Sequence, residues 1–303
     1  MPEVWIQMVK PTVISTFAGC GGSSLGYQMA GFRELLAVEW DDNAVETFRL
    51  NFPDVLVYHG DIAKLTGDEC MRLAGIEKGA LDVLDGSPPC QGFSTAGKRK
   101  FDDPRNSLFK EYARLLSELQ PRCFVMENVT GMVKGAMKQA YLTIIKTLRE
   151  CGYKAKGEVL NAMYFNVPQS RERVIIIGIR EDLGIEPSHP KPLNKKISVH
   201  DIWPEFSGKV VERRKGRNDT THKYRPITEP SPTIPKCGGH IEIDGKRARW
   251  PHEIAKKIAT FPDDFRFVGS ISQKAERIGS CVPPLLMKAI AEHIKVNILK
   301  AGD

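Results

Sequence analysis

One cysteine lies in a segment whose neighbours could make it a nucleophile. Cys90 follows Pro88 and Pro89, and the apolar residues 80–84 just before them predict a short buried strand. Because the prolines stop that strand and restrict the backbone, the thiol should be fixed at a strand end, the edge where open α/β sheets bind ligands. A lone cysteine is more often a small buried hydrophobe, so the rest of the chain must decide between these interpretations.

A second candidate is an acid at the end of another predicted strand. Residues 123–126 are apolar, and Glu127 follows them directly. An unpaired buried carboxylate costs several kcal/mol, so its position needs a reason. A general acid would supply one, because burial raises a carboxyl pKa and lets the group hold a proton near neutral pH. The alternative is that Glu127 caps the following helix.

The N-terminal region has the pattern of a nucleotide-binding site. Residues 13–16 predict a strand, residues 17–22 a glycine-rich turn, and the next residues a helix that runs to Ala30. A second strand, residues 35–38, ends in Glu39, which could take both ribose hydroxyls, and Trp40, which offers a face for adenine. An ordinary turn is the alternative, and a nicotinamide site is disfavoured because Ser24 occupies the third glycine position of G-x-G-x-x-G.

Five blocks together resemble the cytosine-C5 methyltransferases, in that family's order. They are residues 17–22 (Phe-Ala-Gly-Cys-Gly-Gly), 88–91 (Pro-Pro-Cys-Gln), 127–129 (Glu-Asn-Val), 169–173 (Gln-Ser-Arg-Glu-Arg) and 279–284 (Gly-Ser-Cys-Val-Pro-Pro). The resemblance covers nearly the whole chain. It implies an α/β fold: a Rossmann-like S-adenosylmethionine-dependent methyltransferase fold with a mixed, mostly parallel sheet, plus a small target-recognition domain. One departure is Ser280, where the family has Asn, because serine has fewer hydrogen-bonding groups.

The resemblance also implies a set of functional residues. The catalytic residues would be Cys90, Glu127, Arg171 and Arg173. The cofactor-binding residues would be Phe17, Ala18, Gly19, Gly21, Gly22, Glu39, Trp40, Asp61, Ile62, Pro88, Leu108, Ser280 and Val282. The DNA-binding residues would be Gln91, Ser94, Lys98, Arg99, Arg213, Arg214, Lys215 and Arg217. Read as bare residues, Asp61 is a helix N-cap, Leu108 is core, and the basic side chains are solvated surface.

The family's organisation implies three segments. Residues 1–185 would form the catalytic, S-adenosylmethionine-binding domain, residues 186–274 the target-recognition domain, and residues 275–303 a C-terminal helix that returns to the catalytic domain. The sequence pattern weakens between residues 181 and 237, where prolines are frequent and periodicity is low. Apolar residues such as Trp203 and Phe206 nevertheless give this region something to pack, so we expect it to fold.

Composition bears on the partners. The 303 residues carry a formal net charge of +7, which suits a polyanion, and residues 191–225 hold ten Lys and Arg against four acids. The seven cysteines include no C-x-x-C pair and no zinc-like spacing, so we expect a reducing compartment and no metal. We find no signal peptide or membrane-length apolar run, and expect a cytoplasmic monomer in a prokaryotic or phage-infected cell.

The resemblance, with which the composition agrees, implies a DNA (cytosine-5-)-methyltransferase. It would transfer a methyl group from S-adenosyl-L-methionine to carbon 5 of cytosine in a short sequence of double-stranded DNA, by base flipping and a covalent bond between Cys90 and carbon 6. A cognate restriction endonuclease could act in the same system, while a phage or solitary enzyme is equally compatible with the sequence. The alternatives are a tRNA cytosine-5 methyltransferase of the same fold and a catalytically silent DNA-binding member.

Overall fold

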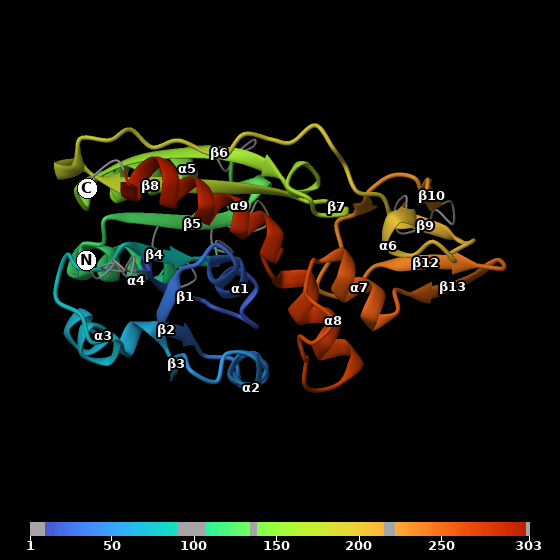
Figure 1. The fold of residues 1–303 in the computed structure, drawn as a ribbon, viewed down its shortest axis with the longest axis horizontal. Helices are drawn as coiled ribbons and strands as arrows, with labels where there is room; N and C mark the ends of the chain where they lie inside the picture. The colour runs from blue at the N-terminus through green and yellow to red at the C-terminus, as the bar shows by residue number, and fades with distance from the viewer. Residues whose placement is uncertain (1–9, 90–106, 134–137, 215–221, 301–303) are drawn as a thin grey trace, which may run out of the picture.

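The computed structural model describes residues 10–89, 107–133, 138–214 and 222–300. The chain forms a large body around a seven-stranded sheet and a smaller lobe around a four-stranded sheet (Figure 1). A third, two-stranded sheet pairs β7 (Gln169–Ser170) with β11 (Ser231–Pro232) and so ties the smaller lobe to the body. In the described residues, no helix has the length and apolar character needed to cross a membrane.

The large sheet is mixed and mostly parallel, which confirms the predicted fold class. Its strand order is β3-β2-β1-β4-β5-β8-β6. The five parallel strands are β1 (Thr12–Thr16), β2 (Arg33–Glu39), β3 (Leu56–His59), β4 (Val83–Gly86) and β5 (Cys123–Val129). An antiparallel pair ends the sheet, since β8 (Glu172–Arg180) pairs antiparallel with both β5 and β6 (Tyr153–Asn161). The strand predicted from residue 80 begins only at Val83.

Helices cover both faces of this sheet. One face carries α1 (Gly22–Met29), α2 (Asp42–Asn51) and α9 (Pro284–Ile294), and the other carries α3 (Gly67–Ala74), α4 (Ser107–Leu119) and α5 (Lys138–Glu150). Helix α9 packs on α1 so closely that a Cβ at Gly26 would come within 2.6 Å of Met287. The chain continues as a π-helical turn, Lys295–Leu299.

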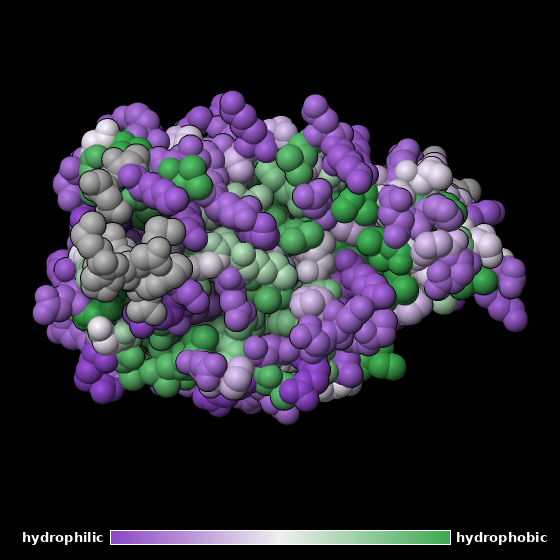
Figure 2. Space-filling view, viewed as in Figure 1, coloured by the Kyte–Doolittle hydropathy of each residue, from purple (hydrophilic) through white to green (hydrophobic). Residues whose placement is uncertain are grey.

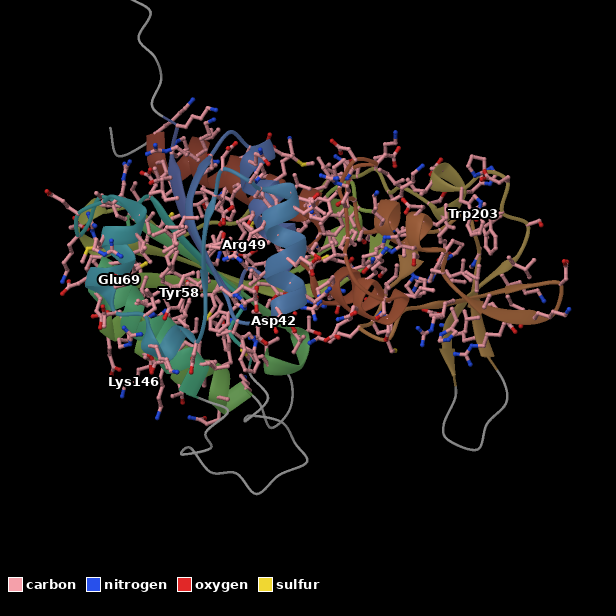
Figure 3. All side chains as sticks on the ribbon, turned by 90° about the horizontal axis from the view of Figure 1, so that it is seen from below. Asp42, Arg49, Tyr58, Glu69, Lys146 and Trp203 are labelled. Carbon is pink, nitrogen blue, oxygen red and sulfur yellow. The ribbon has the colours of Figure 1, made fainter. Side chains whose placement is uncertain are left out.

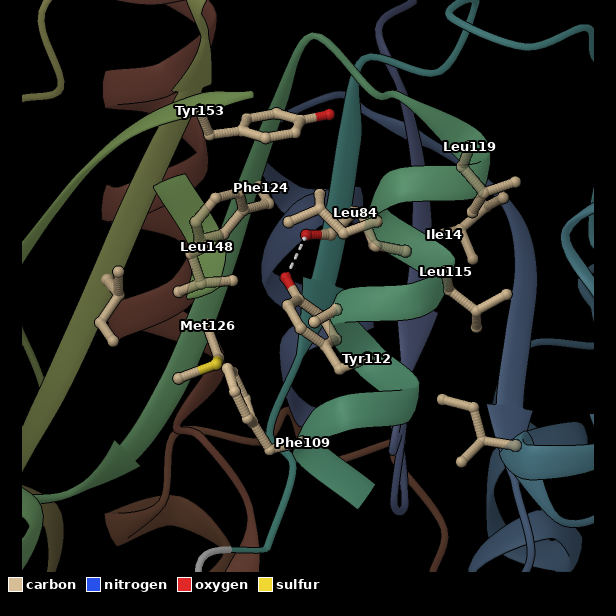
Figure 4. Packing of buried hydrophobic residues seen from close by; sticks show 14 of the residues in the cluster. Ile14, Leu84, Phe109, Tyr112, Leu115, Leu119, Phe124, Met126, Leu148 and Tyr153 are labelled. Carbon is tan, nitrogen blue, oxygen red and sulfur yellow. Dashed lines mark hydrogen bonds between the residues drawn. The ribbon is translucent and has the colours of Figure 1, made fainter. Parts of the chain in front are cut away.

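The α4 face has a core that also satisfies its buried polar groups. Tyr112 on α4 donates from its hydroxyl to the carbonyls of Leu84 at 3.2 Å and Val125 at 3.3 Å, and so contacts two neighbouring strands (Figure 4). Phe124 packs edge-on against Tyr112 and Tyr153. Because a buried hydroxyl without a partner would be costly, these bonds fix α4 over the strand that leads to Cys90.

The smaller lobe is folded, as expected from its apolar residues. Its sheet has the order β10-β9-β12-β13, with β9 (Lys209–Arg214), β10 (His222–Arg225), β12 (His240–Ile243) and β13 (Lys246–Arg249). Helices α6 (Val199–Ile202) and α7 (His252–Ile258) belong to this lobe, and Trp203 stacks on Phe206 at 4.5 Å between ring centroids. Figure 3 shows Trp203 in this lobe, far from Asp42 and Arg49 on α2 of the large body.

Helix α8 (Ile271–Ser280) lies between the two parts. The space-filling view shows hydrophobic residues gathered where the body and the lobe meet, and hydrophilic residues over the outer end of the lobe (Figure 2). The predicted segment boundary between residues 274 and 275 falls inside α8, and the domain limits stay a prediction. Short 3₁₀ turns, Ile62–Lys64, Thr130–Val133, Ala162–Tyr164 and Glu181–Leu183, complete the described chain.

Candidate active site

Several predicted site residues meet at the carboxyl edge of the large sheet. β4 ends at Gly86 and leads to Pro88, and β5 runs through Glu127 to Val129 beside it. The predicted residues that lie outside the described part of the chain are Cys90, Gln91, Ser94, Lys98, Arg99, Lys215 and Arg217. Arg213 and Arg214 are the last two residues of β9, an inner strand of the smaller sheet.

Glu127 and Arg173 form the central contact of this edge. In the antiparallel pairing of β5 and β8, Arg173 lies opposite Val129, two residues from Glu127, so the two side chains share one face. Glu127 Oε1 is 2.7 Å from Arg173 Nε, and the side chains are only 11% and 14% exposed. The acid is thus not a helix cap: a guanidinium compensates its partly buried charge, which would otherwise be expensive.

Arg171 has different partners from Arg173, although the family resemblance assigns both residues to the catalytic set. Arg171 is 1% exposed, donating from Nη2 to the carbonyl of Gly279 at 3.1 Å and from Nη1 to that of Ile234 at 3.4 Å. Burial, with a smaller effect of Arg173, lowers the pKa of Arg171 to about 10. Both bonds go to protein carbonyls, so the described geometry gives Arg171 a structural contact between α8 and the start of the smaller lobe.

Asn128 is a site residue to which the sequence assigned no role. Its side chain donates to the carbonyl of Pro88 at 2.9 Å, while its Oδ1 accepts from the backbone N–H of Val129. The bond joins β5 to the proline segment that precedes Cys90. The signal was present in the sequence, since Asn128 follows Glu127 in the matched block, but its partner depends on the adjacency of β4 and β5.

The glycine turn is shaped by packing as much as by space for a ligand. Phe17 and Gly19 have φ of 55° and 56°, a region costly for a bulky residue such as Phe17. A Cβ at Gly21 would lie 2.3 Å from Phe52, and one at Gly22 would lie 2.4 Å from the carbonyl of Val282. Of the three described glycines of the turn, Gly19 alone faces open space, with nothing within 4 Å of its Cβ position.

Glu39 and Trp40 lie next to this turn, as predicted. Glu39 accepts hydrogen bonds from the backbone N–H groups of Gly19 at 2.7 Å, Trp40 at 2.8 Å and Asp41 at 2.9 Å. Because each carboxylate oxygen accepts about two bonds, Oε1 is filled and Oε2 keeps one acceptor site. That is fewer than the two ribose hydroxyls expected from the sequence. The Trp40 ring is 76% exposed and so is accessible to a flat ligand.

The remaining predicted cofactor residues differ in accessibility. Asp61 is an exposed N-cap that accepts from Ala63 N–H at 3.0 Å, which is its simpler interpretation. Ser280 is exposed and donates its hydroxyl to the carbonyl of Glu276 at 2.6 Å, so its side chain is bonded within α8. Phe17, Ala18 and Leu108 are half-buried, while Ile62, Pro88 and Val282 are buried.

A second thiol lies near the Glu127–Arg173 pair. Cys281 donates from Sγ to the carbonyl of Ile278 at 3.1 Å. Burial raises the pKa of the Cys281 thiol to about 11, which the nearby Arg171 and Arg173 only partly oppose. A thiolate is the reactive form of cysteine, so Cys281 stays protonated at neutral pH and does not compete as a nucleophile. Among the described residues, no group of three His, Cys, Asp or Glu side chains is arranged to hold a metal.

Comparison with known proteins decides the family. The chain matches the family model described as C-5 cytosine-specific DNA methylase over residues 11–236 and 200–296. The chain belongs to this family. It is 36% identical over 333 residues to the type II methyltransferase M1.HphI of Haemophilus parahaemolyticus, with 96% of this chain and 89% of that protein aligned. It is 31% identical to M.NgoFVII of Neisseria gonorrhoeae, with 94% and 86% aligned.

Solved structures show the same fold. A candidate DNA modification methyltransferase encoded within an Escherichia coli prophage has a TM-score of 0.77 at 24% identity and covers 95% of this chain and 99% of its own. A DNMT2 variant from Spodoptera frugiperda has a TM-score of 0.71 at 20% identity and covers 94% and 99%. The family relationship confirms the predicted DNA (cytosine-5-)-methyltransferase activity, whose methyl donor in this family is S-adenosylmethionine.

Proposed function

We propose that this methyltransferase acts on a short specific sequence of double-stranded DNA through a covalent bond between Cys90 and carbon 6 of a flipped cytosine. The family relationship supports DNA cytosine as the methyl acceptor. The single observation that carries the mechanism is the Glu127–Arg173 pair, which lies on β5 and β8 beside the strand that leads to Cys90.

The chemistry must overcome the weak nucleophilicity of carbon 5. The Cys90 thiolate forms a bond to carbon 6, and the electrons of the C5–C6 double bond make carbon 5 nucleophilic while Glu127 holds a proton at N3. The cofactor, when bound, supplies an electrophilic methyl group on its sulfonium. Carbon 5 accepts that methyl and then loses its proton to water or another base. The electrons of the broken C5–H bond re-form the double bond and expel the Cys90 thiolate.

Each described residue of the edge has a part in this scheme. Arg173 holds the Glu127 carboxyl in one orientation through the 2.7 Å contact. Asn128 fixes the carbonyl of Pro88 and with it the start of the nucleophile segment. A stacked base cannot reach such a strand edge, so the target base must leave the duplex. Arg171 supports the pocket from behind, through its bonds to Gly279 and Ile234.

The described residues around the glycine turn fit S-adenosylmethionine. The open side of Gly19 and the N-terminus of α1 would accept its carboxylate, because free N–H groups there favour an anion. The exposed ring of Trp40 would stack on the adenine, and the remaining site on Glu39 Oε2 would take a ribose hydroxyl. The other cofactor contacts proposed are Phe17, Ala18, Gly21, Gly22, Asp61, Ile62, Pro88, Leu108, Ser280 and Val282.

DNA would lie between the body and the smaller lobe. Phosphate contacts from basic residues would give position and salt-dependent affinity, and lobe side chains would read the bases. The proposed DNA-binding residues are Gln91, Ser94, Lys98, Arg99, Arg213, Arg214, Lys215 and Arg217. We further propose that the enzyme is a cytoplasmic monomer and that a restriction endonuclease of the same specificity accompanies it, as the names of its type II relatives suggest.

The decisive experiment is transfer of labelled methyl from S-adenosylmethionine to unmethylated duplex DNA, beside tRNA, followed by bisulfite sequencing. We expect label on cytosines of one short sequence and none with Cys90→Ala. A persistent adduct should form on duplexes that contain 5-fluorocytosine, because fluorine at carbon 5 cannot leave as a proton. Label on tRNA alone would favour the RNA-directed alternative. Cofactor binding without transfer to either substrate would favour a silent DNA-binding protein.

A further inference from the structure

A buried acid lies between the glycine turn, residues 17–22, and the proline segment that precedes Cys90. Asp85 on β4 is 3% exposed and pairs in register with Ser15 on β1, beneath α1. Its backbone carbonyl accepts from the hydroxyl of Thr16 at 2.9 Å, and its Oδ1 accepts from the hydroxyl of Tyr27 at 3.4 Å. Asp85 thus belongs to the strand that leads to Cys90 and contacts both the end of β1 and the helix α1.

A second acid lies two strands away on the same face. Glu34 on β2 pairs with Val13, and its Oε1 accepts from the hydroxyl of Ser24 on α1 at 2.9 Å. Its Oε2 is inaccessible to solvent, and neither this oxygen nor the nearby hydroxyl of Ser15 has a hydrogen-bond partner among the described residues. The space beneath α1 therefore contains two carboxyls surrounded by serine and tyrosine hydroxyls.

Among the described residues, no cation pairs with either of these two carboxyls in the way that Arg173 pairs with Glu127. Burial raises the pKa of Glu34 to about 7, and the nearby hydroxyls of Ser15 and Ser24 oppose this rise. Burial also raises the pKa of Asp85 well above its ordinary value; the charges of Glu34 and Glu127 add to the rise, and Ser23 and Tyr27 oppose it. Burial also raises the pKa of Tyr112, which packs on the opposite face of the sheet, and the charge of Asp85 adds to that rise. Burial and the neighbouring carboxyls thus both favour the neutral form of Asp85.

We propose that Asp85 is a positioning residue that couples the glycine turn to the strand that leads to Cys90, and that a charge on its buried side chain weakens cofactor binding and methyl transfer. This inference rests on the proposed function for the roles of the turn and of Cys90. An ionised Asp85 would put a negative charge beneath the N-terminus of α1, where the carboxylate of S-adenosylmethionine is proposed to bind. It would also repel ionised Glu34 and Glu127 and so disturb the end of β4.

The test compares three variants of the full chain. Asp85→Asn keeps the shape and polarity of the protonated acid but cannot ionise, Glu34→Gln removes the neighbouring charge, and Asp54→Asn changes an exposed acid outside the site. The affinity for S-adenosylmethionine is measured by calorimetry between pH 6 and 10. Ratios to the Asp54→Asn control cancel the titration of the cofactor's own groups.

We expect the unmodified chain and Asp54→Asn to lose affinity in parallel, approaching about tenfold per pH unit once the single proton is lost. In Asp85→Asn, the part of this loss that comes from ionisation of Asp85 should disappear, and only the loss from the cofactor's own groups should remain. In Glu34→Gln the loss from Asp85 should begin at lower pH, because removal of the Glu34 charge lowers the pKa of Asp85. A purely structural role of Glu34 would not move the curve in that direction.

An alkaline loss in Asp85→Asn equal to that of the control would overturn the proposal. If Asp85→Asn does not fold, an unmoved curve in Glu34→Gln overturns it. If S-adenosylmethionine does not bind at any pH, the proposed function has failed. The unfolding temperature is then measured against pH instead. Equal curves for Asp85→Asn and Asp54→Asn would show that ionisation of Asp85 has no effect on the protein and would overturn the inference. Cofactor binding without methyl transfer would contradict the proposed function and leave this measurement valid.

Discussion

Glu127 on β5 and Arg173 on β8 form a 2.7 Å ion pair because the antiparallel register places them diagonally on one face of the sheet. The relationship gives the acid a fixed orientation without a helix cap. It also means that the two residues act as a unit, so the effects of changing them should not add.

Changes to this pair should remove catalysis more than cofactor binding. We expect Glu127→Gln to lower the rate of methyl transfer by about 10²- to 10⁴-fold, the usual contribution of a general acid, with cofactor affinity within about twofold of the original. Glu158→Gln is the matched control, since Glu158 occupies the same row of the sheet on β6, opposite Ile175, and pairs with Lys156 at the surface. Transfer in Glu127→Gln at the control's rate would remove Glu127 from the mechanism.

The bond between Asn128 and Pro88 predicts a variant that is folded but slow. Asn128→Ala removes the donor that fixes the Pro88 carbonyl, so the nucleophile segment should lose its alignment. We expect a rate about tenfold or more lower and a free energy of unfolding lower by about 1–3 kcal/mol. Asn297→Ala, at an exposed position of the C-terminal helix, should change neither. Equal rates in the two variants would show that the bond does not position Cys90.

Arg171 should matter for stability first. Arg171→Met keeps an apolar stem but leaves the carbonyls of Gly279 and Ile234 without their donor, each at a cost of about 1–3 kcal/mol. Urea unfolding should show this loss, whereas the exposed Arg49→Met should cost under about 0.5 kcal/mol. An Arg171→Met protein as stable as Arg49→Met but unable to transfer methyl would instead favour direct contact between Arg171 and the substrate.

How much the sequence could predict depends on whether the relevant contact is local. The strand-turn-helix around residues 17–22 follows from local pattern and is confirmed. The partners of Arg171 are backbone carbonyls from distant segments, which no side-chain pattern marks. The Glu34–Asp85 relationship requires the strand order β2-β1-β4. The smaller sheet was missed because its strands are short and its apolar residues lack a clear period.

The buried carboxyl of Glu34 predicts a pH dependence of stability with a definite sign. Its pKa is about 7 in the folded chain and near 4.5 when exposed, so between these values the folded state keeps a proton that the unfolded state has lost. The contribution of this group is therefore greatest below about pH 4.5 and declines until about pH 7, by on the order of 3 kcal/mol in total. Urea unfolding at pH 5 and pH 8 should show a smaller difference for Glu34→Gln than for the exposed Glu46→Gln; equal differences would contradict this assignment.

Trp40 should separate cofactor binding from folding more cleanly than any other residue of the site. Its ring is 76% exposed, so Trp40→Ala removes little packing and should leave the unfolding temperature within about 1–2 °C of the original. The loss of an adenine stacking face should nevertheless weaken S-adenosylmethionine binding, by roughly 5- to 150-fold for a stacking contact of about 1–3 kcal/mol. Trp203→Ala is the contrasting variant, because Trp203 stacks on Phe206 in the smaller lobe: it should lower stability and spare cofactor affinity. Unchanged cofactor affinity in Trp40→Ala would show that the adenine binds elsewhere. It would also contradict the proposed orientation of the methyl group toward the strand edge.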